Sequence, residues 1–414
     1  MTRYGKIFLL LLAIGVLAWI LPWLYSFATP DTRYAPFILM SEVNDQLLHN
    51  LPADGKGLSM IDQQGRVYSG VAIDSMLPTF YYRQLIADGR LPDTLRGVAM
   101  TPKAIQAGNF IFRSSPSDLN RRVPGLYPLL ESRSGRVDLE MPDDVFRITD
   151  QGIEFIDMAT NTIKAEKSRT FTLAMEKKGF AFPATAIAGN PTTRKDYDNG
   201  YLLIDRNHRV FRLMMVRGRP FVRDTGIDPQ IGMVQGFVTE FPGRQYIGYL
   251  TDRNSQLYVL TSDYELIRMP VGSFDPKTES LMIVGNLFNR TVRIGGNDSV
   301  RWYGLRADDR TLVTQQEVSF PPSAAQKIAG WVFPFRLSFT SSVDGYAYPR
   351  FEGGSPCAFV LGAVLAGAWI AMRRKRKRRI VLPALVILAT GMYGFLAFLL
   401  LKVPENERQI TILS

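Results

Sequence analysis

The sequence has 414 residues, of which 46% are hydrophobic, and its formal net charge is +11. That charge is concentrated in the run Arg373–Arg379 and, to a smaller extent, in Arg3 and Lys6, so the segment from residue 26 to residue 354 is nearly balanced. A nucleic-acid-binding protein gathers Lys and Arg on one face. The charge pattern therefore excludes an overall nucleic-acid footprint, and we expect no nucleic-acid partner.

The N-terminal segment is apolar and long enough to cross a membrane. Ile7–Tyr25 reads IFLLLLAIGVLAWILPWLY and contains no charged residue, and a helix of about 20 residues spans the hydrocarbon core of a bilayer. Residues 1–25 are thus predicted to form a transmembrane anchor. The alternative is a cleaved signal peptide, with the small residues Ser26 and Ala28 before the cut.

Residues 26–354 are predicted to form a β-rich domain. Three segments are rich in β-branched and aromatic residues and are bounded by turn-forming residues. They are VFRLMMV (Val210–Val216), QLYVL (Gln256–Leu260) and TVRIGG (Thr291–Gly296). Helical periodicity is scarce, and one short helix is expected at Thr79–Asp88, with Thr79 as its cap and Gly89 closing it.

An internal repeat supports the β-rich prediction. GYLLIDRNHRVFRL from Gly200 aligns with GYLTDRNSQLYVL from Gly248, and weaker echoes occur elsewhere in the chain. In each copy an apolar strand ends at an Asp, whose side chain can bond the backbone two residues on before a hairpin turn. The Asp residues of the repeat, which we expect to form turns, are Asp62, Asp150, Asp205 and Asp252.

Hairpins of this kind bury an apolar face only when several of them pack together. Four-stranded blades at spacings of about 40–50 residues make a β-propeller, whereas irregular hairpins make a stack or a sandwich. The spacings of the repeat Asp residues are uneven, so both arrangements stay open. The predicted fold class is a mainly β extracytoplasmic domain, irregularly propeller-like or built of stacked β-hairpins with few short helices, plus three transmembrane α-helices.

Patterns for catalysis or metal binding are scarce. His49 and His208 are the only histidines, and the single cysteine, Cys357, lies in an apolar stretch, which leaves no set of zinc ligands. Neither a G-x-S-x-G nucleophile turn nor a phosphate-binding glycine loop occurs in the sequence. The paired carboxylates Asp143-Asp144 and Asp308-Asp309 are expected to be solvated turn residues. We therefore expect no catalytic, cofactor-binding or metal-binding residue and no cofactor.

Two further apolar stretches follow the β-rich segment. Ser355–Met372 and Ile380–Leu401 contain no charged residue, and together they predict a transmembrane hairpin over residues 355–401. Gly362 and Gly367 give the first of these stretches a small-residue face that suits close helix packing. The partner helix would be the second stretch of the hairpin or a helix of another subunit.

The basic run between these stretches predicts the topology. Short loops rich in Lys and Arg stay on the cytoplasmic side of a membrane. The loop 373–379 consists of Arg373, Arg374, Lys375, Arg376, Lys377, Arg378 and Arg379. By alternation, residues 26–354 and the short tail 402–414 are expected on the extracytoplasmic side, and contact between the basic loop and membrane lipids is expected as well.

Three longer stretches carry a resemblance to a known family. They are LPTFYYRQLIADGRLPDTLRG from Leu77, NGYLLIDRNHRVFRLMMVRGRPFVRD from Asn199 and YELIRMPVGSFDPKTESLMIVGNLF from Tyr264. They are similar to an uncharacterised bacterial family of membrane-anchored domains of unknown function, whose members are encoded beside ABC-transporter components. The resemblance implies association with an ABC system and brings no catalytic motif with it.

We expect a non-enzymatic, membrane-anchored accessory or sensor protein. The resemblance implies an ABC-transporter permease or another membrane subunit as partner. The expected location is the bacterial inner (cytoplasmic) membrane, as a multi-pass protein whose large domain faces the periplasm. Two alternatives stay open: an envelope hydrolase or lyase with a carboxylate-based site on a β-propeller, and a permease component.

Overall fold

The computed structural model describes residues 3–30, 35–51, 58–133, 135, 138–373 and 381–401. The chain divides into two compact units, and we call Ala35–Ser319 the β unit and Met1–Tyr34 with Phe320–Ser414 the helical unit. The segment 320–354, which the sequence analysis assigns to the β-rich domain, belongs to the helical unit. The reason is that Phe333 packs with Ile14 and Tyr393 in one hydrophobic cluster.

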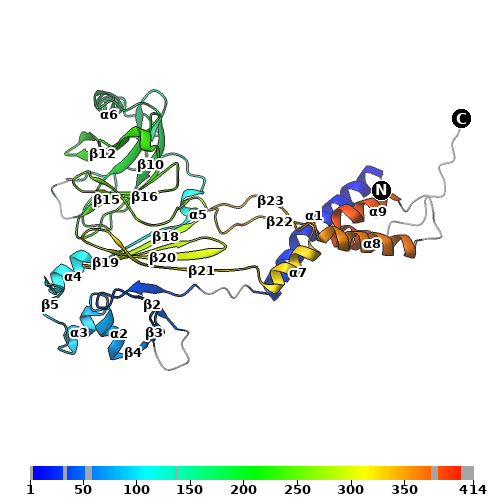
Figure 1. The fold of residues 1–414 in the computed structure, drawn as a ribbon. Helices are drawn as coiled ribbons and strands as arrows, with labels where there is room; N and C mark the ends of the chain where they lie inside the picture. Colours follow the sequence, from blue (N-terminus) through cyan, green and yellow to red (C-terminus); the bar gives the residue numbers. More distant parts are fainter. Residues whose placement is uncertain are drawn as a thin grey trace. The chain divides into compact units, whose positions relative to one another are not determined.

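The β unit is mainly β, with several short helices (Figure 1). Its first sheet has the strand order β1-β2-β3-β4. The strands are β1 (Ile38–Met40), β2 (Leu47–Asn50), β3 (Ser59–Ile61) and β4 (Val67–Ser69). The chain then forms α2 (Val71–Met76), α3 (Tyr82–Ala87), the hairpin β5 (Thr94–Leu95) and β6 (Val98–Ala99), and α4 (Pro102–Gly108).

Two further four-stranded sheets are antiparallel meanders, in which each strand pairs with the next one along the chain. The first contains β10 (Ala184–Gly189), β11 (Tyr201–Asp205), β12 (Val210–Val216) and β13 (Arg219–Asp224). The second contains β14 (Met233–Val238), β15 (Tyr246–Asp252), β16 (Leu257–Thr261) and β17 (Leu266–Arg268), and the short 3-10 helix η1 (Pro229–Ile231) precedes it. Before them come α5 (Pro116–Leu119), the hairpin β8 (Asp144–Ile148) and β9 (Ile153–Asp157), and α6 (Ala165–Lys177).

The largest sheet has five strands in the order β21-β20-β19-β18-β7, so an early strand joins four late ones. Its strands are β7 (Phe110–Ser114), β18 (Ser280–Gly285), β19 (Asn289–Gly295), β20 (Ser299–Arg306) and β21 (Leu312–Ser319). Strand β7 pairs antiparallel with β18, with Phe112 opposite Ile283. This pairing connects the N-terminal part of the β unit to its C-terminal part.

The strands follow from apolar runs that are buried on both faces. Every residue of β11 and of β15 is buried, and β12 occupies the range Val210–Val216 that the sequence pattern predicts. Two aromatic-rich cores result, one on the large sheet around Phe112 and Tyr249 and one beneath α6. Burial of this much apolar area is the main favourable contribution to folding.

The helices of the β unit differ in part from the prediction. Helix α3 lies within the expected range, but its N-cap is Tyr81, because the Thr79 side chain bonds Glu42 instead of capping the helix. Helix α6, which the search for long periodicity missed, has 13 residues and buries Phe171 and Met175. These two residues lie four positions apart and therefore share one helix face.

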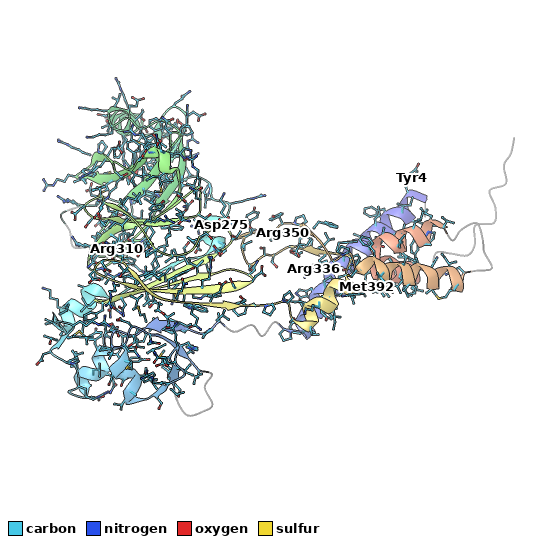
Figure 2. All side chains as sticks on the ribbon, viewed as in Figure 1. Tyr4, Asp275, Arg310, Arg336, Arg350 and Met392 are labelled. Carbon is cyan, nitrogen blue, oxygen red and sulfur yellow. The ribbon has the colours of Figure 1, made fainter. Side chains whose placement is uncertain are left out.

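The helical unit consists mainly of apolar helices and one hairpin. Its elements are α1 (Arg3–Ala28), α7 (Ala324–Val332), β22 (Phe335–Ser338), β23 (Arg350–Gly353), α8 (Ala358–Met372), α9 (Val381–Thr390) and α10 (Met392–Leu400). Figure 2 labels Tyr4 near the start of α1, and Arg336 and Arg350 on the hairpin of β22 and β23. Ion pairs within this hairpin join Arg350 to Asp344 and Arg336 to Glu352.

The prediction of three membrane-spanning helices is not supported. Among the described residues, only α1 is both long and apolar enough to cross a membrane. Helix α8 has 15 residues, and the third predicted span is divided at Gly391 into helices of 10 and 9 residues. Gly391 adopts a φ of 58°, outside the helical region, so neither half reaches much beyond about 15 Å.

Close packing between α8 and α9 depends on Gly362. A Cβ placed there would lie 2.9 Å from the carbonyl oxygen of Leu388, whereas a Cβ at Gly367 would meet nothing within 4 Å. We expect Gly362→Val to destabilise the helical unit by about 2 kcal/mol, because overpacking forces the backbones apart. Gly367→Val is the matched control, and thermal unfolding of the full chain in detergent measures both. Equal effects of the two variants would contradict the packing role of Gly362.

Candidate functional site

Three of the repeat Asp residues form the same turn. Asp62, Asp205 and Asp252 are buried, and one carboxylate oxygen of each accepts backbone N–H bonds of 2.8–2.9 Å from the residues two and four positions on. The residue three positions on has a positive φ in every copy: Gly65 (83°), His208 (62°) and Ser255 (59°). The structure thus places these carboxylates in hairpin turns, where one oxygen of each is occupied by the backbone; the second oxygens of Asp62 and Asp252 accept from the hydroxyls of Tyr68 and Tyr258.

Asp150 departs from this arrangement. It lies in the turn between β8 and β9, but its side chain is exposed. Thr149 makes the side-chain bonds of that turn, accepting from the Gln151 N–H at 3.3 Å and donating to the Gly152 carbonyl at 3.1 Å. The role that the repeat assigned to Asp150 therefore belongs to the preceding residue.

One of the paired carboxylates is not solvated as expected. Asp144 is buried and pairs with Lys167 at 2.8 Å, whereas Asp143 is exposed. The helix α6 brings Lys167 over the strand hairpin, where its ammonium group also lies 4.3 Å from the centroid of the Phe155 ring. The pair is therefore part of the packing of α6. Asp308 and Asp309 are exposed turn residues, as predicted.

The basic loop is described only at its first residue. Arg373 follows α8, and its guanidinium carbon lies 5.1 Å from the centroid of the Trp369 ring. The other members of the predicted topology signal, Arg374, Lys375, Arg376, Lys377, Arg378 and Arg379, lie outside the described residues, as does the tail 402–414.

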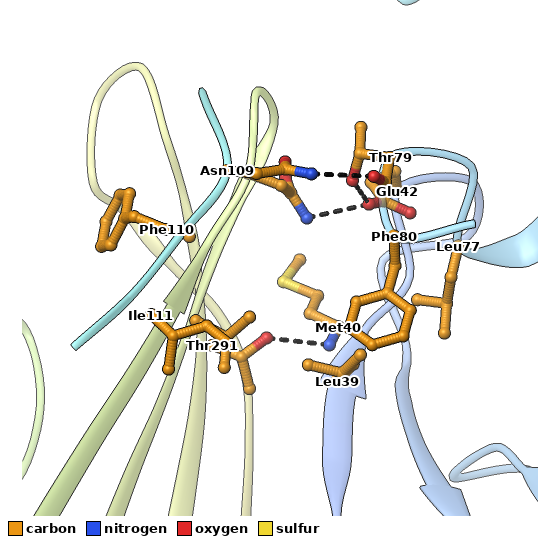
Figure 3. Close-up of a pocket in the computed structure, with 13 residues that line it drawn as sticks. Leu39, Met40, Glu42, Leu77, Thr79, Phe80, Asn109, Phe110, Ile111 and Thr291 are labelled. Atoms are coloured by element: carbon orange, nitrogen blue, oxygen red, sulfur yellow. Dashed lines mark hydrogen bonds between the residues drawn. The ribbon is translucent and has the colours of Figure 1, made fainter. Parts of the chain in front are cut away.

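A cavity of about 260 Å³ in the β unit is the strongest candidate site (Figure 3). Four loops supply polar side chains to it: Glu42 from the β1–β2 turn, Thr79 between α2 and α3, Asn109 between α4 and β7, and Asn286 between β18 and β19. Strand β19 adds Thr291. Its walls are otherwise apolar and include Leu39, Leu77 and Val284. An apolar cavity with a few convergent polar groups is typical of a small-molecule site.

The β1 strand is held against the large sheet beside this cavity. The Met40 N–H donates to the Thr291 hydroxyl at 2.9 Å, and the Asn289 amide donates to the Ser41 carbonyl at 3.1 Å. These bonds join segments that are about 250 positions apart in the sequence. They position Glu42, the next residue of the β1–β2 turn, at the cavity.

Glu42 is fully buried, and only one of its oxygens is engaged. Its Oε1 accepts from the Thr79 hydroxyl and from the Asn286 amide, the latter at 2.8 Å. Its Oε2 has no hydrogen-bond partner among the described residues, and neither does Oδ1 of Asn109. A buried acceptor without a partner is costly, so a donor that reached either atom would be favoured.

Burial raises the pKa of Glu42 to about 7, although the hydrogen bond from Thr79 and the charge of Arg96 act in the opposite direction. A carboxyl group with such a pKa exchanges its proton near neutral pH. The site therefore presents either a neutral acid or a carboxylate, depending on small changes of pH or on the charge of what enters the cavity.

This pKa predicts a pH dependence of stability. The folded protein retains the Glu42 proton at pH values where the unfolded chain has lost it, so the free energy of unfolding falls as pH rises from 5.5 to 7, by about 2 kcal/mol. In Glu42→Gln this contribution is absent. Denaturant titration of the full chain in detergent, at both pH values, measures the difference, and Glu265→Gln, at an exposed position, is the control. Identical slopes in wild type and Glu42→Gln would contradict the assignment.

The sequence analysis did not identify this site. Glu42 lies in the polar stretch SEVNDQ, which reads as an ordinary turn. The other polar lining residues are Thr79, Asn109, Asn286 and Thr291, which belong to no motif. None of the predicted site residues that the structure describes lines the cavity.

Comparisons with known proteins give a family but no activity. The family described as "Domain of unknown function (DUF4857)" matches residues 37–305, and none of the curated proteins matches the chain.

Two solved structures are distantly similar. PorZ, a bacterial surface component of the type-IX secretion system of Porphyromonas gingivalis, is 9% identical with a TM-score of 0.23, and the match covers 72% of this chain and 28% of PorZ. The β-propeller domain of Myceliophteria thermophila Cps50 (Swd1) is 9% identical with a TM-score of 0.24, covering 48% of this chain and 57% of that domain. The chain thus spans less than two thirds of either structure, and at these TM-scores neither likeness carries an argument.

Proposed function

Because the chain belongs to the DUF4857 family of domains of unknown function, we propose a function from its own geometry: a membrane-anchored accessory or sensor protein. In this proposal the helical unit holds the protein in the membrane. The β unit lies on the extracytoplasmic side and binds a small molecule in the Glu42 cavity.

The observation that carries the proposal is the apolar outer surface of the helical unit. The helices pack on one another through a core that includes Trp369, Ile387 and Phe398. Large apolar side chains also cover their outward faces, among them Phe8, Leu11, Trp23, Phe359, Val364, Val381, Leu382 and Leu400, all exposed. A soluble protein rarely exposes so large an apolar patch, whereas the hydrocarbon of a bilayer covers it favourably.

Several contacts favour a permanent anchor over a cleaved signal peptide. Ile14 and Ala18 of α1 are buried against Tyr393 and Ala397 of α10, and the Tyr25 hydroxyl donates to the Ala325 carbonyl at 3.0 Å. Cleavage after α1 would expose this core. We therefore propose that α1 stays attached and crosses the membrane with its N-terminus in the cytoplasm.

The shorter helices are proposed to be embedded beside α1. Helix α8 ends with Arg373 beside Trp369, a pairing suited to a membrane interface, where aromatic and basic side chains anchor helix ends. Gly391 separates α9 from α10, and Gly394 lies close to Ile387, so the chain folds back at this point. In a membrane, neighbouring helices must cover the backbone groups that a break in a helix leaves unpaired.

For the β unit we propose an irregular, propeller-like arrangement of the meanders. The first strand of one meander, β10, packs against the first strand of the next, β14. Blades of a propeller likewise meet through their innermost strands. An experimental structure of the full chain tests this arrangement directly.

The proposed partner is the permease or another membrane subunit of an ABC-type transporter. The family resemblance of the sequence motivates this choice, and the outward apolar surface of the helical unit leaves room for helices of another subunit. Crosslinking in native membranes followed by mass spectrometry tests it. Recovery of an ABC permease supports the partner, and its absence from the crosslinked products counts against it.

The membrane proposal has its own test. In cells that express the full chain, we expect the protein to stay in the membrane pellet after carbonate extraction, with its N-terminal residues intact by mass spectrometry. Protease added to spheroplasts should digest the β unit. Release of the protein by carbonate, or protection of the β unit, would overturn the proposal.

A second candidate function is carboxylate-based hydrolysis or elimination. The observation in its favour is Glu42, because a general acid or base works best with a pKa near the operating pH. Its weakness is that no second titratable side chain lines the cavity. Turnover of glycan or peptide substrates by the purified protein, lost in Glu42→Gln, would promote this candidate above the first.

A further inference from the structure

We propose that the Glu42 cavity binds a small organic ammonium ion, with its nitrogen at the Glu42 carboxylate and its apolar part against the cavity walls. This inference rests on the proposed function and names the class of ligand for the same site. It follows from the hydrogen-bonding character of the lining, from the charge of the lining and from the size of the cavity.

The open polar atoms of the cavity are acceptors. The Asn109 amide nitrogen donates to the Thr79 carbonyl at 2.8 Å, and this bond fixes the orientation of the side chain. The Oδ1 atom of Asn109 has no partner among the described residues. Glu42 offers Oε2, while Thr79 and Asn286 occupy its other oxygen. Figure 3 shows Glu42, Thr79 and Asn109 gathered at one end of the cavity. A primary ammonium group, with three N–H donors and no acceptor, complements a lining whose open polar atoms are acceptors.

The charge of the lining favours a cation. Of the described residues that line the cavity, Glu42 is the only ionisable one, and none is a Lys or Arg. An anion would therefore meet a carboxyl group without any compensating positive charge. A bound ammonium ion instead pairs with the carboxylate, and charge-assisted hydrogen bonds of this kind are about twice as strong as neutral ones.

A metal ion fits the lining less well. Hard cations such as calcium require about six to eight oxygen ligands, whereas the described residues contain no group of three potential metal ligands. The remaining walls, formed by Leu39, Leu77 and Val284 among others, are apolar. Such walls favour the hydrocarbon part of an organic ligand, because its burial removes apolar surface from water.

The cavity volume and its opening limit the size of the ligand. At about 260 Å³, the cavity is smaller than the range of about 300–1,000 Å³ that is typical of drug-sized ligands. Phe80 and Ile111, which line it, are 47% and 51% exposed. A ligand of the size of a short alkylamine therefore suits the cavity better than a drug-sized one.

Binding of an ammonium ion requires the ionised form of Glu42. The affinity should therefore rise with pH up to the pKa of Glu42 and then level off. Arg96 is the charged side chain that acts on Glu42, and its positive charge lowers the pKa of the carboxyl group. A neutral ligand would show no such dependence.

The test is isothermal titration calorimetry on the full chain in detergent. The probes are n-alkylammonium ions from ethyl to hexyl, with the n-alkanols and n-alkanoates of equal length as neutral and anionic controls. We expect saturable binding of an ammonium probe at one site. The affinity should be at least about tenfold weaker in Glu42→Gln, which removes the charge-assisted bond, and unchanged in the exposed control Glu265→Gln.

Each other outcome overturns the ammonium assignment. Equal or tighter binding of the alkanol or alkanoate would place the ligand in another class, while the cavity would remain a binding site. Ammonium binding that Glu42→Gln leaves unchanged would place the site elsewhere. Absence of binding by every probe would also overturn it.

The membrane extraction and protease experiments are independent of these results, so failure of the proposed function is seen separately. A cooperative thermal unfolding transition shows that Glu42→Gln is folded.

Discussion

Replacing Lys195 with Met is expected to lower the free energy of unfolding by about 3–5 kcal/mol, because it leaves two buried carboxylates without a cation. The Lys195 ammonium group lies 2.6 Å from both Asp198 and Glu240, and its side chain is only 4% exposed. It also donates to the Asn190 carbonyl. These contacts join the loop before β11 to the loop after β14, so the substitution weakens the junction of two sheets.

The environment of Glu240 supports this expectation. Burial raises the pKa of Glu240, while the Asn199 N–H and Lys195 act to lower it. Without Lys195, Glu240 should take up a proton more readily, and the destabilisation should be smaller at pH 5 than at pH 8. Denaturant titration of the full chain, followed by tryptophan fluorescence at both pH values, measures the effect.

Two matched variants keep the Lys195 prediction decisive. Lys178→Met removes an exposed lysine and should change the free energy of unfolding by no more than about 0.5 kcal/mol. The triple variant Lys195→Met, Asp198→Asn, Glu240→Gln removes all three charges and should recover part of the loss. A single variant as stable as wild type, or a triple variant less stable than the single one, would show that the cluster is not an interdependent ion network.

Replacing Asp205 with Ala is expected to lower the free energy of unfolding by about 3 kcal/mol. Asp205 is fully buried, and its carboxylate accepts from the N–H groups of Asn207 and Arg209 at 2.8 Å and of Ala181 at 3.1 Å. Alanine leaves these donors without an acceptor inside the turn. The same denaturant titration measures the loss.

Asp150→Ala is the control for this prediction, because Asp150 occupies the corresponding position of the repeat but is exposed. We expect a change of no more than about 0.5 kcal/mol there. The loss of unfolding free energy in Asp252→Ala should be closer to the loss in Asp205→Ala. Asp252 accepts from the N–H groups of Asn254 and Gln256 and also from the Tyr258 hydroxyl at 3.2 Å. If Asp205→Ala matched Asp150→Ala, the repeat turns would contribute little to stability.

The repeat turns were predictable because their interactions are local. Asp205 and Asp252 each bond backbone N–H groups two and four residues away, so a short window of sequence contains most of the determinants. The bond from Ala181 to Asp205 is the exception. The same window misled at Asp150, where Thr149 makes the side-chain bonds. Both residue types bond the local backbone, and the letters alone do not decide between them.

The apolar segments were also visible in the sequence, and Ile7–Tyr25 lies in the long helix α1 as predicted, but the lengths of the C-terminal helices were not predicted. Hydropathy is additive along the chain and identifies Ile7–Tyr25 and both C-terminal stretches. The end of a helix depends instead on backbone angles and packing. Gly391 takes a positive φ, and this residue breaks the helix of the stretch Ile380–Leu401. Pro334 lies 3.2 Å from the position that a Cβ of Gly391 would occupy. A contact between residues more than fifty positions apart thus accompanies the break.

Sequence alone determined the mainly β character of the large segment, its hairpin turns and its apolar ends, since each depends on neighbouring residues. Only the tertiary structure decided the Glu42 site. Glu42 and Asn286 are 244 positions apart, and neither is unusual in its own stretch of chain. The raised pKa of Glu42 and its free oxygen come from burial, which the folded surroundings create and no local pattern encodes.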